Sequence, residues 1–448
     1  QNLANFYNHL FSNISKREDP QGNVSFLNRA LGSLETVFEN PGESLKVLLS
    51  KKQRLDNSSN NPYGVNLFHN TNRYVDDRGN TIIKTKTWMP KYYIPEDDSA
   101  QTTIPKTQST GNNFFYNIGI TAGIETTACA LDWIQGCNRM DLIITPSEHA
   151  KLSIASTIYN EQDKNTGQLI RQHKLEKPIE VLFEGFDETT FGTDEVANIS
   201  ELDEIKEDFV FLFVGHWLQG DLGEDRKNVG MMIKTFAMAF KDEKVKPALV
   251  LKTSSAGFSV IDRENMIKKI KEALGKDFGK VPVYLLHGDM ADYQLNGLYE
   301  HPKVKAMLNF TKGEGFGRPL LEFSLTGKPV IVSNWSGHLD FLKDGAVLLD
   351  GELKNVHESA ANQFLLKEAQ WFNVNISKAL SKIKDVYKNY DKYKVAAFQL
   401  GKQNKQNFSL EKMTKLFDGI LNQYGIYTKI QPKFQQIQLP KLKMLNKK

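Results

Sequence analysis

The stretch that decides the fold is a glycine-rich turn leading into a helix-like segment, Glu314-Gly315-Phe316-Gly317-Arg318-Pro319-Leu320-Leu321-Glu322. It directly follows the apolar run at 306–310, which predicts a buried strand. Glycines let the backbone turn tightly and approach a ligand, and the start of the next helix presents free N–H groups and a positive end. We therefore expect a phosphate-binding turn. Glu314 lies on this turn and Glu322 about two helical turns further on, so the two carboxylates are expected to contact different parts of an extended ligand.

The same alternation of strand and helix extends to both sides of the turn. Apolar runs of strand length recur at residues 209–214, 248–251, 283–286, 306–310 and 330–332. The intervening segments 229–240 and 265–274 have the apolar spacing of helices. Continuous apolar strands separated by helices are typical of a parallel sheet that is covered on both faces. We therefore predict a doubly wound α/β domain over residues 201–400.

A second α/β domain is predicted before it, over residues 1–200. Apolar runs at 114–121 and 141–145 predict strands, and Pro146-Ser147-Glu148-His149 reads as the turn and N-cap of the next helix. Two Rossmann-like domains imply a cleft between them. Within the first domain, 55–113 is rich in Asn, Ser, Thr, Asp and Pro, which predicts a loop-rich insertion with short strands, for example at 81–85. Residues 401–448 predict a C-terminal helix and a basic tail.

Length and composition bound the remaining possibilities. The chain has 448 residues, 40% hydrophobic and 25% charged, and lacks an uninterrupted apolar run of ~18 residues, so no membrane span is expected. Cys129 and Cys137 have no second pair near them, which argues against a disulfide framework and against a zinc site. The first residues lack the features of a secretory signal, so a cytoplasmic location is expected. The excess of Lys over Arg is typical of AT-rich genomes such as those of many phages.

The run at 314–322 resembles the E-x7-E signature of retaining glycosyltransferases with the two-domain GT-B fold, especially those of family 4. Further segments follow that family's order: Phe213-Val214-Gly215, Arg226-Lys227-Asn228, 286–290, 298–299, 327–331 and Ser336-Gly337. In the first half, 119–126 and 146–151 are similar to segments of a subgroup of these enzymes. The resemblance covers about residues 115–345 and none of 1–113. It implies a glycosyltransferase (hexosyl- or pentosyltransferase) that uses a nucleotide-diphosphate sugar, for example a UDP-sugar.

The resemblance also assigns the sugar and ribose contacts of this donor. Glu314 and the backbone of Phe316 and Gly317 would hold the donor sugar, and Glu322 would bind the hydroxyls of the ribose. The alternative for Glu314 is a carboxylate that caps the helix, and for Glu322 a position on a solvated helix face.

The diphosphate contacts are assigned in the same way. Arg318, Pro319 and Leu320 would line the diphosphate pocket through their backbone. Lys227, with Arg226 beside it, would balance the charge of the diphosphate. The alternative for Lys227 is an exposed lysine without a role in binding.

The base of the donor would be held by Gly288, Asp289 and Met290, mainly through their backbone. One position departs from the family. Many relatives have Arg after the glycine of the first strand, whereas this chain has His216. Lys252, at the end of the second strand, is our candidate for the missing cation. Both His216 and Lys252 have the alternative of a solvated or locally satisfied side chain.

The reaction follows from charge. Cleavage of the bond between the anomeric carbon and the diphosphate develops negative charge on the leaving oxygen, which fixed cations stabilise. The chain contains no D-x-D motif, so a metal-dependent GT-A enzyme is disfavoured and neither a metal nor a cofactor is expected. Glu125 either faces the cleft and orients the acceptor hydroxyl or caps the next helix. His149 is expected to cap or pack.

The acceptor is left open by the sequence. Residues 1–200 have 19 basic and 24 acidic side chains, which suits a glycan, lipid-linked or small-molecule acceptor. A rival hypothesis is a phage enzyme that glycosylates 5-hydroxymethylated pyrimidines in DNA, because 46–106 has ten basic and six acidic residues and supplies candidate phosphate contacts. A third hypothesis is a non-catalytic sugar-binding or nucleic-acid-binding module on the same fold.

Overall fold

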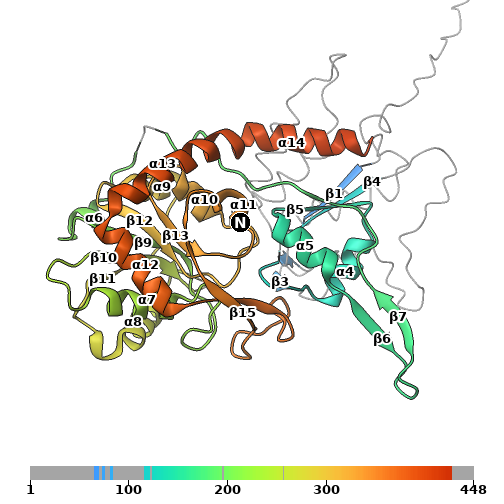
Figure 1. Ribbon diagram of the computed structural model, residues 1–448. Coiled ribbons are helices and arrows are strands. Elements are labelled where there is room, and N and C mark those ends of the chain that lie inside the picture. Colours follow the sequence, from blue (N-terminus) through green and yellow to red (C-terminus); the bar gives the residue numbers. More distant parts are fainter. Residues whose placement is uncertain are drawn as a thin grey trace, which may run out of the picture.

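The computed structural model describes residues 65–69, 73–75, 81–83, 116–121, 124–193, 196–255 and 257–425. Two parallel sheets with helices packed on them dominate this part of the chain (Figure 1), so the predicted α/β fold is confirmed. Of the expected insertion at 55–113, only three short strands are described, and the basic tail at 429–448 lies outside the described residues. No described helix is both long enough and apolar enough to cross a membrane.

The first domain is built on a parallel sheet with the strand order β1-β4-β5-β8. Its strands are β1 (Val65–His69), β4 (Tyr116–Ile120), β5 (Leu142–Thr145) and β8 (Ile179–Val181), and its helices are α4 (Leu131–Asn138) and α5 (Glu148–Ser156). The expected N-cap is present, because the Ser147 side chain accepts a hydrogen bond from the Ala150 N–H at 3.1 Å. This cap fixes the start of α5 directly after β5.

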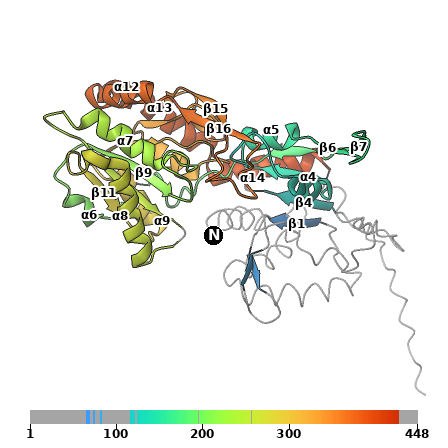
Figure 2. The same ribbon diagram turned by 90° about the horizontal axis from the view of Figure 1, so that it is seen from below.

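Two antiparallel hairpins accompany the first sheet. They are β2 (Arg73–Val75) with β3 (Thr81–Ile83), and β6 (Tyr159–Gln162) with β7 (Leu169–His173). The strand expected at 81–85 thus forms as β3. The β6–β7 hairpin extends away from the sheet in both views (Figures 1 and 2). Most of its side chains are exposed, and for this reason no apolar pattern in the sequence indicated it.

The second domain is built on six parallel strands in the order β11-β10-β9-β12-β13-β14. The strands are β9 (Val210–His216), β10 (Ala248–Ser254), β11 (Val283–Leu286), β12 (Val304–Asn309), β13 (Val330–Ser333) and β14 (Val347–Leu349). The helices are α6 (Ser200–Asp203), α7 (Val229–Phe240), α8 (Val260–Leu274), α9 (Asp292–Glu300), α10 (Arg318–Ser324) and α11 (Leu339–Leu342), with a 3-10 turn at Gly275–Asp277. A hairpin of β15 (Gly351–Asn355) and β16 (Gln370–Val374) follows.

Buried side chains on both faces of the second sheet explain its stability. The apolar run of β9 is buried throughout Val210 to Val214, as expected for a central strand. On one face, Phe211 packs against Phe236 and Phe240 of α7, with ring centroids 6.0 and 5.9 Å apart. The other face belongs to a core that continues through Phe186 into the first domain. Burial on both faces is the property that the apolar runs predicted.

The C-terminal helices connect the two domains. They are α12 (Ile376–Lys388), α13 (Tyr390–Asn407) and α14 (Leu410–Gln423). In Figure 1, α14 runs from the second domain toward the first. The Tyr424 hydroxyl donates a hydrogen bond to the carboxylate of Glu180, in β8, at 2.7 Å, and the Phe186 N–H donates to the Phe408 carbonyl at 3.0 Å. The end of the described chain therefore fastens the second domain to the first.

Candidate functional site

The site predicted at 314–322 lies at the carboxyl ends of β9 and β12. These strands are neighbours in the sheet, although β10 and β11 lie between them in the chain. In open α/β sheets, ligands bind in the crevice outside the strand ends at such a reversal of strand order. The loop after β9 carries Arg226 and Lys227, and the loop after β12 carries Glu314. The topology alone therefore brings these three residues together.

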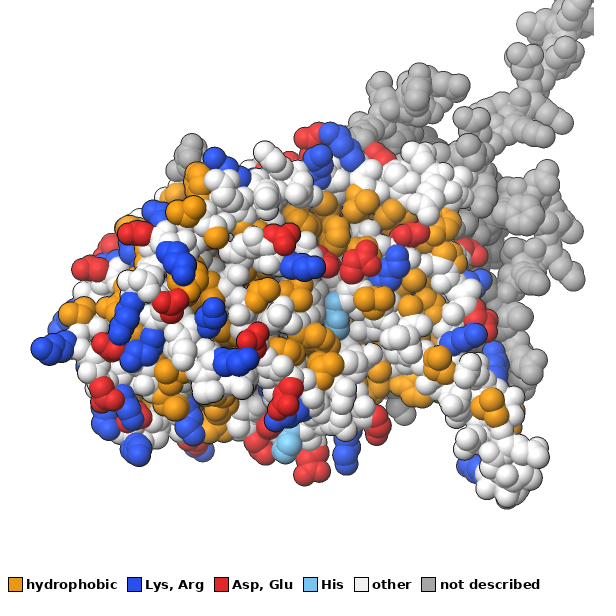
Figure 3. All heavy atoms as spheres, viewed as in Figure 1, with side chains coloured by type: hydrophobic (Ala, Val, Ile, Leu, Met, Phe, Trp, Pro, Cys, Tyr) orange, Lys and Arg blue, Asp and Glu red, His pale blue; other side chains and the backbone are white. Residues whose placement is uncertain are grey.

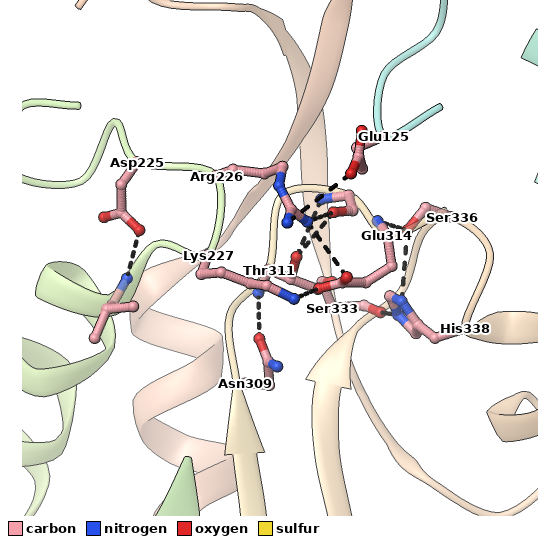
Figure 4. Close-up of polar contacts among 12 residues, drawn as sticks. Glu125, Asp225, Arg226, Lys227, Asn309, Thr311, Glu314, Ser333, Ser336 and His338 are labelled. Carbon is pink, nitrogen blue, oxygen red and sulfur yellow. Dashed lines mark hydrogen bonds and ion pairs between the residues drawn. The ribbon is translucent and has the colours of Figure 1, made fainter. Parts of the chain in front are cut away.

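Glu314 is held between two cations (Figure 4). Its side chain forms a short ion pair with the Lys227 ammonium, and its other oxygen lies 3.3 Å from the Arg226 guanidinium. Arg226 also donates a hydrogen bond to the Gly313 carbonyl at 2.8 Å. Glu314 is only 5% exposed, and α10 has Gly317 and not Glu314 at its N-cap, so Glu314 is neither solvated nor a helix cap. Lys227 is likewise mostly buried, which contradicts the alternative of a free surface lysine.

The backbone of the turn is fixed by its neighbours. The Glu314 N–H donates to the Ser336 hydroxyl at 2.9 Å, and the Gly337 N–H donates to the Glu314 carbonyl at 3.0 Å. Gly317 has φ +98°, a left-handed conformation that a residue with a Cβ adopts only under strain. The side chain of Phe316 is buried against Phe341 in the core, with ring centroids 4.9 Å apart. For Phe316, therefore, the backbone is the part that remains for a ligand contact.

The helix after the turn, α10, is short for the phosphate-binding role that the sequence predicts. Helix α10 has seven residues, begins at Arg318, and has Pro319 in its first turn. Leu320 is buried in the core. A helix this short has few aligned peptide dipoles, so an anion bound at the turn, as predicted, would depend mainly on side-chain cations.

The charges of this cluster determine its ionisation. Burial by itself raises the pKa of the Glu314 carboxyl, but the adjacent Lys227 and Arg226 outweigh burial and bring this pKa down to about 2. Burial lowers the pKa of the Lys227 ammonium, and the Glu314 carboxylate opposes that effect. At neutral pH the cluster therefore consists of an ionised carboxylate between two cations.

This ionisation predicts an acid-dependent loss of stability. The folded-state pKa of Glu314 is below the unfolded value of 4.5, so its ion pairs stabilise the folded state fully above pH 4.5 and progressively less as the pH falls toward 2. At pH 7 we expect the wild-type protein to unfold at a higher urea concentration than Glu314→Gln. We expect the difference between the two midpoints to shrink as the pH falls from about 4.5 to 3. Urea unfolding at several pH values measures it. A difference that stays constant with pH would contradict the ion-pair assignment.

Glu125 lies opposite this cluster, in the first domain. Its carboxylate is 3.9 Å from the Arg226 guanidinium. A Cβ on Gly313 would lie 1.9 Å from the Glu125 carbonyl oxygen, so the two domains touch at this turn. Helix α4 begins at Leu131 with Ala130 at its N-cap, and the alternative that Glu125 caps this helix is therefore wrong. Its carboxylate instead faces the domain junction where the cleft was predicted.

A second contact crosses the same junction. The Glu148 N–H, at the start of α5, donates to the Asp340 carboxylate of α11 at 2.9 Å. Burial raises the pKa of Asp340 to about 6. The ring of His149 packs edge-on against Trp335, with centroids 4.6 Å apart, so of the two expected roles His149 packs and Ser147 caps. With the contact between Gly313 and Glu125, these contacts place α5 and the segment before α4 next to the 314–322 turn.

Glu322 lies deeper than the turn. It is 3% exposed, which excludes a solvated helix face. One oxygen accepts a hydrogen bond from Arg318 at 3.0 Å and the other accepts one from the Tyr299 hydroxyl at 3.3 Å. Burial raises the pKa of Glu322, and Arg318 opposes this shift. The two contacts orient the carboxylate from the second domain alone.

The loop predicted to hold the base follows β11. Gly288 has φ +135°, and a Cβ placed there would meet no atom within 4 Å, so open space lies beside it. Lys252 donates a hydrogen bond to the Gly288 carbonyl at 2.6 Å, and Asp289 accepts one from the Met290 N–H at 3.0 Å. The Lys252 ammonium thus lies at the predicted base loop.

His216 lies at the end of β9, close to the cations. Its Nδ1 is 3.3 Å from the Ser254 hydroxyl. Burial lowers the pKa of His216, and the nearby Lys227, Lys252 and Arg226 lower it further. His216 therefore occupies the position for which the resemblance led us to expect Arg, and its lowered pKa disfavours the charged imidazolium there.

Two residues of the site were not predicted. Glu184, in the segment that joins the domains, is buried, and burial raises its pKa to about 7 although Arg318 opposes the shift. Glu184 lies in a polar connecting segment, and nothing in the sequence around it indicated that this carboxylate would be buried near the site. Lys312 is fully buried two residues before Glu314. The position of Lys312 between an apolar strand and a glycine-rich turn was a sequence signal that this lysine could be buried. The spacing of the sequence did not reveal which residues pair with its ammonium.

Among the described residues, no cluster of three or more His, Cys, Asp or Glu side chains is arranged to hold a metal ion. Metal independence stays a prediction. Cys129 and Cys137 are buried free thiols, in agreement with the expectation that they form no disulfide.

No family model and no curated protein sequence matches this chain. Solved structures with a similar fold include Anabaena HepE in complex with UDP and glucose, at 14% identity and a TM-score of 0.48, covering 69% of this chain and 72% of that one. A sucrose-phosphate synthase from Thermosynechococcus elongatus has 13% identity and a TM-score of 0.46, with 69% and 68% covered. An α,α-trehalose 6-phosphate synthase from Burkholderia multivorans has 9% identity and a TM-score of 0.48, with 70% and 68% covered. At these values the likenesses carry no inference about activity.

Proposed function

We propose that this protein is a retaining glycosyltransferase of the GT-B, family 4 type that transfers a sugar from a nucleotide-diphosphate sugar to an acceptor hydroxyl. The observation that carries the proposal is the convergence of Arg226 and Lys227 on Glu314 where the strand order of the second sheet reverses. Two buried cations at the ligand-binding edge of an α/β sheet suit a diphosphate, and a carboxylate between them suits the hydroxyls of a sugar.

The chemistry assigned to these residues is stabilisation of a leaving group. The bond between the anomeric carbon and the diphosphate oxygen breaks, and the acceptor oxygen bonds to the same face of that carbon. The acceptor proton passes to the departing phosphate. Lys227 and Arg226 stabilise the negative charge that develops on this phosphate, most strongly where water is excluded. No step needs a carboxylate nucleophile.

Donor binding requires an exchange of ion-pair partners. In the structure both cations are already neutralised, Lys227 by Glu314 and Arg226 by Glu314 and Glu125. A diphosphate takes over these cations and frees Glu314 to accept hydrogen bonds from the sugar. Because Arg226 also faces Glu125, donor binding weakens one contact between the domains.

Release of nucleoside diphosphate tests the proposed activity. Purified protein is incubated with UDP-, GDP-, ADP- and dTDP-sugars, with and without candidate glycan or small-molecule acceptors. We expect release from one donor class, faster with acceptor, and retained anomeric configuration in the product by NMR. Binding of a donor without turnover under any condition would favour the non-catalytic binding module, and silence in both assays would end the proposal.

The acceptor is assigned only to a class. A glycan or small molecule is our first choice, and hydroxymethylated DNA in a phage-infected cell is the second. The residues behind the DNA hypothesis, 46–106, lie almost entirely outside the described part of the chain. On the face in Figure 3, basic and acidic side chains of the described residues are interspersed, whereas duplex DNA calls for a basic footprint. Both the cytoplasmic location and the phage origin stay predictions.

Mass spectrometry distinguishes the two acceptors. Duplex oligonucleotides with 5-hydroxymethylcytosine or 5-hydroxymethyluracil are incubated with the protein and with the donor from which it releases nucleoside diphosphate. We expect no added sugar mass while a glycan or small-molecule acceptor is modified. A mass increase of one sugar on the oligonucleotide would reverse this order.

Glu322→Ala is expected to weaken donor binding. A carboxylate that accepts hydrogen bonds from two ribose hydroxyls contributes enough that its loss lowers donor affinity roughly 10- to 100-fold, with a smaller effect on kcat. Calorimetric titration with the donor measures affinity. Glu272→Ala, which removes an exposed glutamate of α8, is the control. Because Glu322 also binds Tyr299, Tyr299→Phe shows how much of the loss comes from disturbed packing. Unchanged donor affinity would remove Glu322 from the donor site.

A further inference from the structure

One lysine near the site has no part in the proposed chemistry and yet is more buried than the cations that do. Lys312 is 0% exposed. Its ammonium donates hydrogen bonds to the Glu224 carboxylate at 3.0 Å and to the Asn373 side-chain oxygen at 2.5 Å, and it lies 4.6 Å from the centre of the Trp371 ring. A buried lysine costs stability unless its charge is paired, and here each partner comes from another segment.

The backbone of Lys312 joins the same segments. Its N–H donates to the Arg226 carbonyl at 2.7 Å, and its carbonyl accepts from the Phe372 N–H at 2.9 Å. Glu224 and Arg226 are therefore both fixed by Lys312, one through its side chain and one through its backbone. The loop that carries the two cations is thus tied to the loop that carries Glu314.

The β15–β16 hairpin extends this connection to the first domain. Phe372 and Asn373, both on β16, contact Lys312. At the start of β16, the Gln370 carbonyl accepts from the Thr127 N–H and the Gln370 N–H donates to the Thr127 hydroxyl, each at 2.9 Å. Lys312 therefore contacts the donor-site loops on one side and the strand that meets the first domain on the other.

We propose that Lys312 is a positioning residue for the diphosphate site: by holding Glu224, Arg226 and β16, it sets Arg226 and Lys227 where they meet the diphosphate. This inference rests on the proposed function. The proposal gives Lys312 itself no donor contact, because its ammonium lies among Glu224, Asn373 and the Trp371 ring and not at Glu314. Without the Lys312 ammonium, Glu224 loses its cation, and only the backbone contact remains between residue 312 and the loop before α7.

The test compares Lys312→Met, which keeps the length and loses the charge, with Lys328→Met. Lys328 is a matched lysine that donates to the Tyr299 and His301 carbonyls at 2.6 and 3.0 Å just before β13, at the opposite end of the sheet from the site. Each variant is titrated by calorimetry with the nucleoside diphosphate that wild type binds best among UDP, GDP, ADP and dTDP, and with the corresponding nucleoside. Unfolding midpoints are recorded for both.

We expect both variants to unfold at lower temperature, but only Lys312→Met to bind the diphosphate more weakly, by roughly 10- to 100-fold, because small displacements of positioned groups are costly. We expect the affinity of Lys312→Met for the nucleoside to stay at the wild-type value. General loosening of the fold would instead weaken the binding of both the diphosphate and the nucleoside. Glu224→Gln removes the same ion pair at a partly exposed position and is expected to act in the same direction with a smaller effect, so the test remains decisive where Lys312→Met fails to fold.

Equal diphosphate affinity in wild type and in the folded variants would overturn the positioning role while leaving the proposed function intact. A parallel loss of diphosphate and nucleoside affinity would also overturn it, because that result indicates general damage. Wild-type protein that binds none of the four diphosphates would instead refute the proposed function, and the inference with it.

Discussion

Glu314→Gln is expected to lower kcat by roughly 100-fold or more, while the nucleoside diphosphate product binds more tightly than it does to wild type. In the structure the Glu314 carboxylate occupies both cations of the site. The amide keeps the size of the side chain but removes its charge. Lys227 then lacks an anionic partner and Arg226 keeps only its longer contact with Glu125, so an incoming diphosphate no longer competes with Glu314 for the two cations. We expect about a tenfold gain in diphosphate affinity.

The two effects are measured separately, kcat from diphosphate release at saturating donor and affinity from calorimetric titration with the product. Glu264→Gln, which removes an exposed carboxylate on α8, controls for the change in net charge. Turnover falls because the amide no longer accepts charge-assisted hydrogen bonds from the sugar. Weaker diphosphate binding in Glu314→Gln would show that Glu314 holds the cations in place for the diphosphate and does not compete with it.

The second domain was predictable because its strands are buried on both faces. The segments expected at 229–240 and 283–286 are α7 and β11 with the same bounds, and the strand expected at 209–214 is β9, two residues longer at its end. Continuous apolar runs leave little choice of structure. The glycine turn after β12 was predictable for the same reason, since it interrupts such a run.

The β15–β16 hairpin was not predictable. The side chains of β15 are all exposed, so this strand carries no apolar period, and its stability comes from pairing with β16. The partners of the site residues were equally hidden. Glu125 meets Arg226 from the other domain, and Lys312 meets Asn373 from a hairpin that the sequence did not indicate. Contacts between segments far apart in the chain depend on the packing of whole domains, which local spacing does not encode.

Burial of the site has a consequence for substrate entry. Glu314 and Glu322 are almost completely covered, and the turn touches Glu125 across the junction. If the site binds a donor as proposed, the two sheets, which share a continuous apolar core, have to move apart to admit it. The polar contacts that resist separation include Arg226 with Glu125 and Asp340 with Glu148, of which the first is long and weakened by a bound diphosphate. Such closure, once the donor is in place, excludes water that would hydrolyse it.

Lys227→Ala is expected to lower kcat by roughly 100- to 1,000-fold, with a smaller change in the donor KM. The Lys227 side chain is mostly buried and pairs with Glu314, and on the proposed function the negative charge on the leaving phosphate is largest in the transition state. An interaction that strengthens as the bond breaks is felt in turnover more than in binding. The assay for diphosphate release identifies the donor. Steady-state kinetics with that donor then give kcat and KM separately.

Two variants control for this result. Lys234→Ala removes an exposed lysine from α7, the helix that follows the loop carrying Lys227, and should retain wild-type kcat. Lys227→Arg keeps the charge and should recover part of the loss, although the planar guanidinium does not reproduce the geometry of the ammonium. A Lys227→Ala enzyme whose KM rises while kcat is unchanged would mean that Lys227 contributes equally to the bound donor and the transition state. The stabilisation of the leaving phosphate would then have to come from Arg226 alone, because it is the other cation that the structure pairs with Glu314.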